Sequence, residues 1–312
     1  MRKLKSFARL TLLALFVCGG LVVKAQQDPQ FSQYMFNPLT VNPAYAGSRG
    51  VMNGAIVYRQ QWVSFPGAPN TQALAINTPL RKGKVGLGAE LLRDEIGPKT
   101  SIGAYLDYAY RLPLGKGKLA FGLGAGILNY HINWSLIDYR DQQDAYAQLA
   151  DEVQNMPDFK FGVYFNNKNF YTGLSITHLN MAHYGHYIAD TVVNSAHLKR
   201  HSFFTIGRAW EVGNFTLNPS LMVRAVINSS LVSIDMNFNA RYKEAIWFGA
   251  SFRTEGDVIL MAQYNITEKW KVGYSYDGTF GRMKGYHGGT HEIMLGFDLN
   301  LFQSQVMSPR FF

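Results

Sequence analysis

The feature that most constrains the fold is an alternation of apolar and polar residues, which recurs in short segments along the chain after residue 50. In the clearest segment, Ile102, Leu106 and Tyr110 share one face, whereas Asp107 and Arg111 share the other. Successive side chains of a β-strand point to opposite faces, so this period of two predicts strands with one apolar and one polar face. Repeated segments of this kind, separated by turn residues, are typical of strands that cross a membrane.

The number and the spacing of these segments indicate a barrel. We count about fourteen, an even number as in single-chain bacterial barrels. Short turns such as 81–84, 115–117 and 166–169 follow every second strand, whereas the longest connections, 132–156 and 180–198, fall in the other set. Outer-membrane barrels have short periplasmic turns and longer extracellular loops, so this sorting favours a barrel over a secreted β-sandwich. The predicted strands cover 52–64, 69–80, 84–94, 99–112, 117–131, 157–166, 169–179, 199–212, 214–228, 230–241, 244–254, 257–267, 269–280 and 289–302.

The first 25 residues have the features of a secretory signal peptide. Basic residues at Arg2, Lys3 and Lys5 precede an apolar run from about Leu10 to Val23, which is short for a spanning helix. Without these residues the chain carries 25 basic and 21 acidic side chains, a net charge of +4, which is too small to indicate nucleic acid as a partner. The single cysteine lies within the predicted signal, so we expect no disulfide in the mature chain.

Residues 26–50 form a segment that matches neither strand nor helix. Pro38 and Pro43 both follow asparagine, a pairing that favours turns. Four aromatic residues, which disordered linkers lack, indicate that the segment packs onto something. Glycines 86, 88, 122, 124 and 126 fall on the predicted lumen face of two strands and leave room there. We therefore expect the segment to fold against the periplasmic mouth or into the lumen, although glycines also ease barrel curvature.

The same segment carries a family resemblance. The runs Asp28-Pro-Gln-Phe-Ser-Gln-Tyr34, Asn37-Pro38 and Asn42-Pro-Ala-Tyr-Ala-Gly47 closely resemble the start of mature PorP/SprF-type outer-membrane proteins of the type IX secretion and gliding machinery. Later runs are similar to that family as well. They are Tyr58-Arg-Gln-Gln-Trp62 with Pro66-Gly-Ala-Pro69, Asp94-Glu-Ile-Gly-Pro98, Pro157-Asp-Phe159, Phe170-Tyr-Thr-Gly173, His291-Glu292 and Ser308-Pro-Arg310.

Pattern and resemblance together predict an all-β chain in four parts. These are a signal peptide (1–25), an N-terminal aromatic and proline-rich segment (26–50), a transmembrane antiparallel barrel of about fourteen strands (51–302) and a tail (303–312). The resemblance implies a non-enzymatic outer-membrane component of the type IX secretion system. Such a component helps to export or anchor a secreted adhesin or other cargo with a C-terminal sorting domain. It also implies contacts with periplasmic motor or peptidoglycan-linked components and with outer-membrane lipid.

Candidate partner-binding residues lie in the N-terminal segment and around the first predicted outer loop, where tryptophan and arginine are typical binding anchors. The other explanation of the second group, which we favour, is an aromatic belt with polar lumen residues. The tryptophans near predicted strand ends would lie in such a belt, namely Trp62, Trp134, Trp210, Trp247 and Trp270. The candidates are Asp28, Pro29, Phe31, Tyr34, Asn37, Pro38, Asn42, Pro43, Tyr45, Arg59, Gln61, Trp62, Pro66 and Gly67.

We expect no catalytic, metal or cofactor site. Histidines 178, 183, 186, 197 and 201 cluster in sequence, but only Asp190 offers a nearby carboxylate. No motif joins Ser275, His291 and Asp298 into a hydrolase triad. Two other functions stay open: a porin-like or hydrophobic-ligand transport barrel, which a wide polar lumen would favour, and a secreted β-sandwich that binds a partner.

Overall fold

The computed structural model of the protein describes residues 28–140, 151–188, 191–281 and 283–300, and the predicted signal peptide and tail lie outside this part. Most of the described chain is β-strand, with five short 3-10 helices. The helices are η1 (Tyr34–Phe36), η2 (Pro38–Thr40), η3 (Pro43–Tyr45), η4 (Arg81–Gly83) and η5 (Trp134–Leu136). The strands are β1 (Met52–Gln60), β2 (Asn70–Leu80), β3 (Val85–Ile96), β4 (Lys99–Leu114), β5 (Gly117–Ile132), β6 (Glu152–Asn166), β7 (Phe170–Thr177), β8 (His183–Ile188), β9 (Thr191–His197), β10 (His201–Arg208), β11 (Trp210–Val212), β12 (Phe215–Val226), β13 (Val232–Tyr242), β14 (Ile246–Arg253), β15 (Asp257–Asn265), β16 (Trp270–Thr279) and β17 (Thr290–Leu299).

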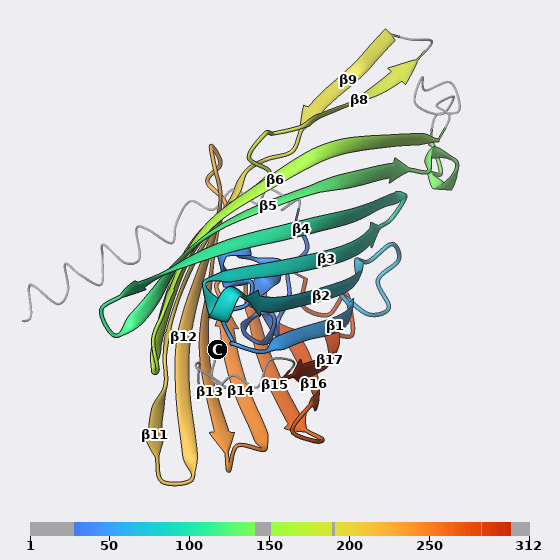
Figure 1. Cartoon of the computed structure of the whole chain (residues 1–312). Helices are drawn as coiled ribbons and strands as arrows, with labels where there is room; N and C mark the ends of the chain where they lie inside the picture. Colours follow the sequence, from blue (N-terminus) through green and yellow to red (C-terminus); the bar gives the residue numbers. More distant parts are fainter. Residues whose placement is uncertain (1–27, 141–150, 189–190, 282, 301–312) are drawn as a thin grey trace, which may run out of the picture.

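The strands form one closed antiparallel barrel (Figure 1). Sequence neighbours pair around the wall, and β1 pairs with β17 to join the two ends of the chain. β10 pairs with both β7 and β12. β11 follows β10 after Ala209 and also pairs with β12, so the two act as one strand of the wall. Counting β10 and β11 as one, and leaving out β8 and β9, the wall has fourteen strands, which confirms the predicted fold. Closure leaves no unpaired edge, as a membrane interior requires.

The two faces of the wall follow the alternation in the sequence. On β4, Leu106 is 71% exposed, whereas its neighbours Tyr105 and Asp107 are 5% and 2% exposed. β13 repeats the pattern, with Phe238 on the outer face and Asn237 and Asn239 buried. The outer face is apolar and the inner face is polar, as expected for a barrel with lipid outside.

Three details differ from the sequence expectation. The connection 180–198, predicted as a loop, contains the β8–β9 hairpin, which projects beyond one end of the barrel in Figure 1. β6 begins at Glu152, five residues before the predicted start, because its first residues pair with the end of β5. Trp247, predicted for an outer aromatic belt, is only 4% exposed and packs on Phe36 inside the barrel.

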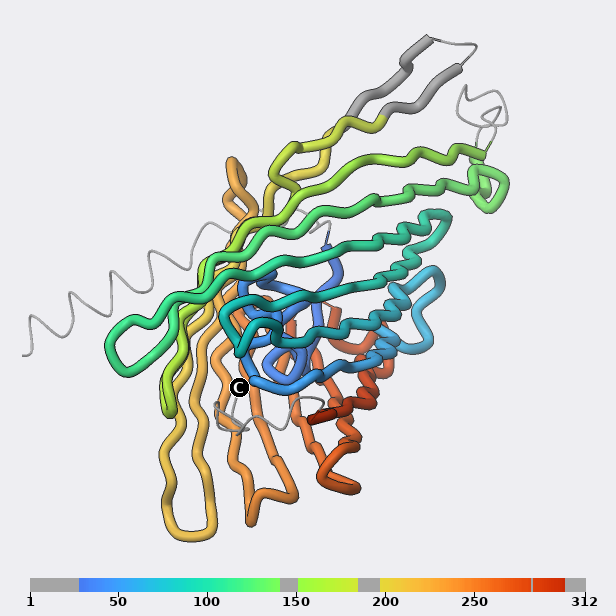
Figure 2. Tube along the Cα trace, viewed as in Figure 1, coloured from blue at the N-terminus to red at the C-terminus, as the bar shows by residue number. Residues whose placement is uncertain are grey.

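The N-terminal segment lies inside the barrel, which is one of the two placements expected from the sequence. Figure 2 shows it in blue, surrounded by the strands. Phe31, Tyr34, Leu39 and Tyr45 are all less than 9% exposed. Its aromatic residues therefore find their apolar contacts in the lumen. The sequence predicts neither strand nor helix here, but the segment contains the three short 3-10 helices η1, η2 and η3.

Lumen glycines make room for the segment. A Cβ atom added to Gly86 would lie 1.9 Å from the Ala46 carbonyl oxygen, and one added to Gly122 would lie 2.1 Å from the Ala44 nitrogen. Gly88 faces Leu39 in the same way. Gly124 and Gly126 instead accommodate the wall side chains Asp107 and Tyr105. Three of the five glycines named from the sequence thus make room for the segment, and two for the wall itself.

Loop lengths orient the barrel. Short turns join β2 to β3, β4 to β5 and β6 to β7, whereas the long connections leave the opposite end. Short turns are periplasmic in outer-membrane barrels, so the β8–β9 hairpin marks the extracellular end. The described residues contain no helix of a length and apolarity that would let it cross a membrane.

Because the outer face of the wall is apolar, the stability lost on introducing a charge should depend strongly on where the charge is placed. Leu106→Arg, in the middle of β4 and 71% exposed, should destabilise the barrel in bilayers by about 2–4 kcal/mol, because it places a charge near the bilayer midplane. Leu136→Arg, in η5 and 69% exposed, changes the same residue type outside the strands and should have little effect. Denaturant unfolding in lipid vesicles measures both, and equal effects would contradict a lipid-facing β4.

Candidate functional site: the lumenal segment and its anchors

The lumenal segment, residues 28–48, is built from three successive 3-10 turns. η2 and η3 both begin at a proline, whose fixed φ and missing N–H suit the first position of a helix. Asn42 caps η3, since its side-chain oxygen accepts a hydrogen bond from the Ala44 N–H at 2.9 Å. The Asn-Pro pairs therefore fold the chain into a compact coil that fits within the barrel.

One anchor of the segment is a buried ionic cluster. The backbone N–H groups of Ser32 and Gln33 each donate to the Glu292 carboxylate at 2.8 Å. Arg59 lies between the carboxylates of Asp277, at 2.8 Å, and Glu292, at 3.1 Å. Arg59, Asp277 and Glu292 are all 2% exposed or less. Charges buried this deeply are stable only with their partners, so the cluster fixes the segment to β1, β16 and β17.

A second buried cluster supports the neighbouring part of the wall. Asp235 on β13 accepts from Arg224 at 2.9 Å and from Arg253 at 3.0 Å. Asn237, two residues further along β13, donates to the Tyr34 hydroxyl of the segment. Polar groups of the inner wall thus find partners within the lumen and in the segment.

The other end of the segment is anchored near the periplasmic turns. The Asn42 side chain donates to the Val163 carbonyl at 3.1 Å, and the Gly47 N–H donates to the Asn77 side chain at 2.8 Å. Tyr45 packs edge-on against Tyr164 with ring centroids 5.6 Å apart. The segment therefore runs along the lumen and contacts the wall at both ends.

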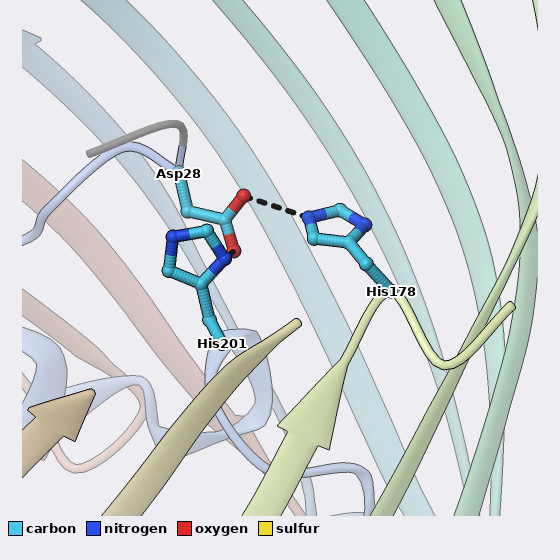
Figure 3. A group of neighbouring side chains, drawn as sticks. All are labelled: Asp28, His178 and His201. Carbon is cyan, nitrogen blue, oxygen red and sulfur yellow. Dashed lines mark hydrogen bonds and ion pairs between the residues drawn. The ribbon is translucent and has the colours of Figure 1, made fainter. Parts of the chain in front are cut away.

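At the extracellular end, Asp28 meets two histidines (Figure 3). The Asp28 carboxylate lies 2.7 Å from His178 Nε2, just after β7, and 3.4 Å from His201 Nδ1, at the start of β10. His178 Nδ1 lies 2.8 Å from Asp158 on the other side. Burial alone would lower the pKa of His178, but the charges and hydrogen bonds of Asp28 and Asp158 raise it to about 10. His178 is thus held as a cation between two carboxylates.

A cavity of about 1020 Å³, which includes space open to solvent, adjoins this cluster. Its apolar lining includes Phe31, Leu128, Phe203 and Met222, and its polar lining includes His178. The segment therefore fills the lumen only partly and leaves a mixed apolar and polar space near the extracellular end.

The structure divides the candidate partner-binding residues into two groups. Those of the N-terminal segment line the lumen, and Arg59 joins them there in the ionic cluster. Gln61, Trp62, Pro66 and Gly67 lie in the β1–β2 loop, at the extracellular end. A partner role for either group stays a prediction.

Sequence reasoning missed the charged partners of three buried or partly buried acidic residues. Asp277 and Asp235 could have been named from their place on the predicted lumen faces of β16 and β13. Asp28 was proposed for partner binding but not as the partner of His178 and His201, because it lies 150 residues from His178 in the sequence. Ser275 is buried, whereas His291 is on the other face of the wall and lies 2.6 Å from the Tyr274 hydroxyl, so these two do not make a triad.

Removing the central cation tests the anchor. Arg59→Met should destabilise the protein by about 3–5 kcal/mol, because it removes the nearest cation from two buried carboxylates and leaves Asp277 only the more distant Arg253, at 3.9 Å. Arg93→Met is the control, since the Arg93–Glu95 pair is about 40% exposed on each side and should contribute at most about 1 kcal/mol. Unfolding midpoints in detergent measure the difference, and an Arg59 variant as stable as the control would contradict the role of the cluster.

Comparison with known proteins places this fold in a family. A family model described as "Type IX secretion system membrane protein PorP/SprF" matches residues 23–297. No curated protein is similar enough to count as a relative.

Solved structures with similar folds are distant from this chain. The Acinetobacter baumannii outer membrane protein Omp33 shares 9% identity at a TM-score of 0.46, over 80% of this chain and 98% of that one. The TodX monoaromatic hydrocarbon channel shares 11% identity at a TM-score of 0.46, over 84% and 94%. The translocator domain of the autotransporter NalP from Neisseria meningitidis shares 12% at 0.44, over 80% and 88%. Likenesses at this level carry no argument about function, but the family match covers most of the chain and agrees with the motifs of the N-terminal segment. The protein therefore belongs to the PorP/SprF family of type IX secretion system membrane proteins.

Proposed function

We propose that this outer-membrane barrel is a closed docking component of the type IX secretion system, without enzymatic activity. In this role it assists the export or surface anchoring of a secreted adhesin or other cargo with a C-terminal sorting domain. The observation that carries the proposal is the occupied lumen: residues 28–48 lie inside the barrel and are anchored to the wall at both ends. A barrel closed in this way has its outer loops and turns available for partners.

Passage of a polypeptide through this lumen would be costly. The segment would have to leave, which separates the Ser32 and Gln33 backbone from Glu292 and exposes the apolar contacts of Leu39 and Tyr45. Hydrogen bonds to charged groups contribute about 1.5–3 kcal/mol each, so the loss of these two bonds is a substantial cost. Docking at the rims requires none of these changes.

The extracellular rim offers an aromatic surface suited to cargo. The β1–β2 and β16–β17 loops are tied together, since Val63 and the Gly288–Gly289 backbone exchange hydrogen bonds of 2.9 and 2.8 Å. Trp62 packs on Phe65 and His287, with ring centroids about 6 Å apart. Phe65 is 39% exposed and Tyr286 is 70% exposed. Exposed aromatic residues on a fixed loop pair are typical anchors of protein interfaces.

The periplasmic rim offers a basic surface. Three neighbouring turns, β2–β3, β4–β5 and β6–β7, carry no acidic residue and five basic ones, Arg81, Lys82, Lys84, Lys116 and Lys168, and Lys118 follows as the second residue of β5. Such a surface favours acidic partners. We assign this rim to periplasmic motor or peptidoglycan-linked components. The N-terminal segment lies inside the lumen, so the turns are the part of the periplasmic end that such partners can reach.

Transport of a small apolar molecule is the second candidate function. It is favoured by the cavity of about 1020 Å³ beside the segment, with Phe31, Phe203 and Met222 in its lining. This alternative requires a continuous path past the segment, which ion conductance would detect.

Conductance separates the two functions. In planar bilayers the native barrel should conduct little, whereas Gly122→Val should raise the conductance, because its Cβ position lies 2.1 Å from the Ala44 nitrogen and displaces the segment. Ala125→Val places the same side chain on the outer face of β5 and should leave the conductance low. Heat-modifiable mobility on gels checks that all three fold. Steady, large conductance of the native barrel would support transport instead.

Pull-downs from native outer membranes test the two rims. Trp62→Ala with Phe65→Ala should reduce recovery of a secreted protein with a C-terminal sorting domain, while periplasmic components stay bound. Lys82→Glu with Lys84→Glu should do the reverse, so each pair controls for the other. Mass spectrometry of the captured proteins measures both. Recovery of the same partners by all variants would contradict docking at these rims.

A further inference from the structure

Three potential metal ligands converge at the extracellular end of the lumenal segment (Figure 3). One ligand atom each from Asp28, His178 and His201 lies within 4.8 Å of the others. They come from three distant parts of the chain: the start of the described segment, the residue after β7 and the first residue of β10. Two imidazoles and one carboxylate are a donor set that Zn²⁺ and related divalent ions accept.

His178 is oriented as metal-binding histidines are. Its Nε2 points to Asp28 at 2.7 Å, while its Nδ1 lies 2.8 Å from Asp158 Oδ2. Asp158 is itself held by the Tyr105 hydroxyl at 2.8 Å and is fully buried. A carboxylate behind the second ring nitrogen fixes the ring and makes the first nitrogen a better ligand.

His201 is poorly satisfied by the protein alone. Its Nδ1 lies 3.0 Å from the Lys199 carbonyl oxygen and 3.4 Å from Asp28 Oδ2. Its Nε2 is buried and has no hydrogen-bond partner among the described residues, and a metal ion on Nδ1 would leave that atom unchanged. The ring is only 3% exposed, and Nδ1 is the nitrogen that faces Asp28, so Nδ1 is the atom available to a metal.

The local charge also suits a divalent cation. Asp28 and Asp158 supply two negative charges, which balance a doubly charged ion when both imidazoles are neutral. The lysines around the same cavity have their nearest carboxylates outside the cluster, since Lys160 pairs with Glu90 at 3.1 Å and Lys99 is attracted by Asp94. Lys99 is also attracted by Asp28 and Lys160 by Asp158, so both lysines compete with the ion for negative charge. The cavity can supply water as a fourth ligand.

We propose that Asp28, His178 and His201 bind one divalent transition-metal ion of the Zn²⁺ class. The ion would replace the proton that His178 Nε2 shares with Asp28. Nδ1 of His201 would give up its contact with the Lys199 carbonyl oxygen and bind the metal instead. Because Asp28 belongs to the lumenal segment and the histidines belong to the wall, the ion cross-links the two. This role is independent of which partners the rims bind.

Metal titration of the purified, folded barrel tests the site. Zn²⁺ should bind in a one-to-one ratio by calorimetry, and Co²⁺ in its place should give the visible absorption of a low-symmetry site with nitrogen and oxygen ligands. His178→Ala or His201→Ala should abolish this binding. Asp158→Asn, which leaves all three ligands in place, should weaken it by about 10–100-fold.

A second pair of histidines provides the control. His183 and His197 face each other across β8 and β9, with ring centroids 5.7 Å apart and both side chains exposed, so they can bind metal on their own. His183→Ala with His197→Ala should leave the one-to-one binding and the Co²⁺ spectrum intact. Loss of binding in this pair but not in the His178 or His201 variants would overturn the proposal, as would no binding by the native protein.

Discussion

The structure depends on burying charge inside a barrel whose outside faces lipid. Arg59 lies between Asp277 and Glu292, and Glu292 in turn accepts the backbone N–H groups of Ser32 and Gln33. No one of these groups is stable there alone, since an unpaired buried charge is expensive. The wall pairs these charges among β1, β16 and β17, and the N-terminal segment adds two backbone donors to Glu292.

The position of the segment also explains why glycines face the lumen where its backbone passes closest to the wall. Gly86 and Gly122 allow the backbone of Ala46 and Ala44 to approach the wall closely, and any side chain at these positions would collide with it. The segment packs on the wall in the periplasmic half beside a pocket lined by Met35, Phe36 and Trp270, and it leaves a second cavity near the extracellular end. A lumen that is occupied but not filled is consistent with a barrel that binds at its rims.

Sequence reasoning predicted the wall well because a strand that faces lipid on one side alternates apolar and polar residues along its sequence. Leu106 and Asp107 could be assigned to opposite faces from that period alone. Trp247 could not be assigned, because an inward aromatic residue is indistinguishable from a belt residue until its contact with Phe36 is known. The Asp28 cluster was likewise beyond reach, since nothing local links Asp28 to His178 and His201. Contacts between the segment and the wall depend on how the chain threads the lumen, which no local pattern records.

Hydrogen–deuterium exchange of residues 28–48 in the membrane-embedded protein tests the central claim most directly, because it reports on the segment without changing the chain. The amides of Ser32 and Gln33 donate to a buried carboxylate, so they should exchange as slowly as amides in the barrel strands. Exchange at the rate of an unstructured tail would show that the segment leaves the lumen readily, and it would contradict a closed barrel.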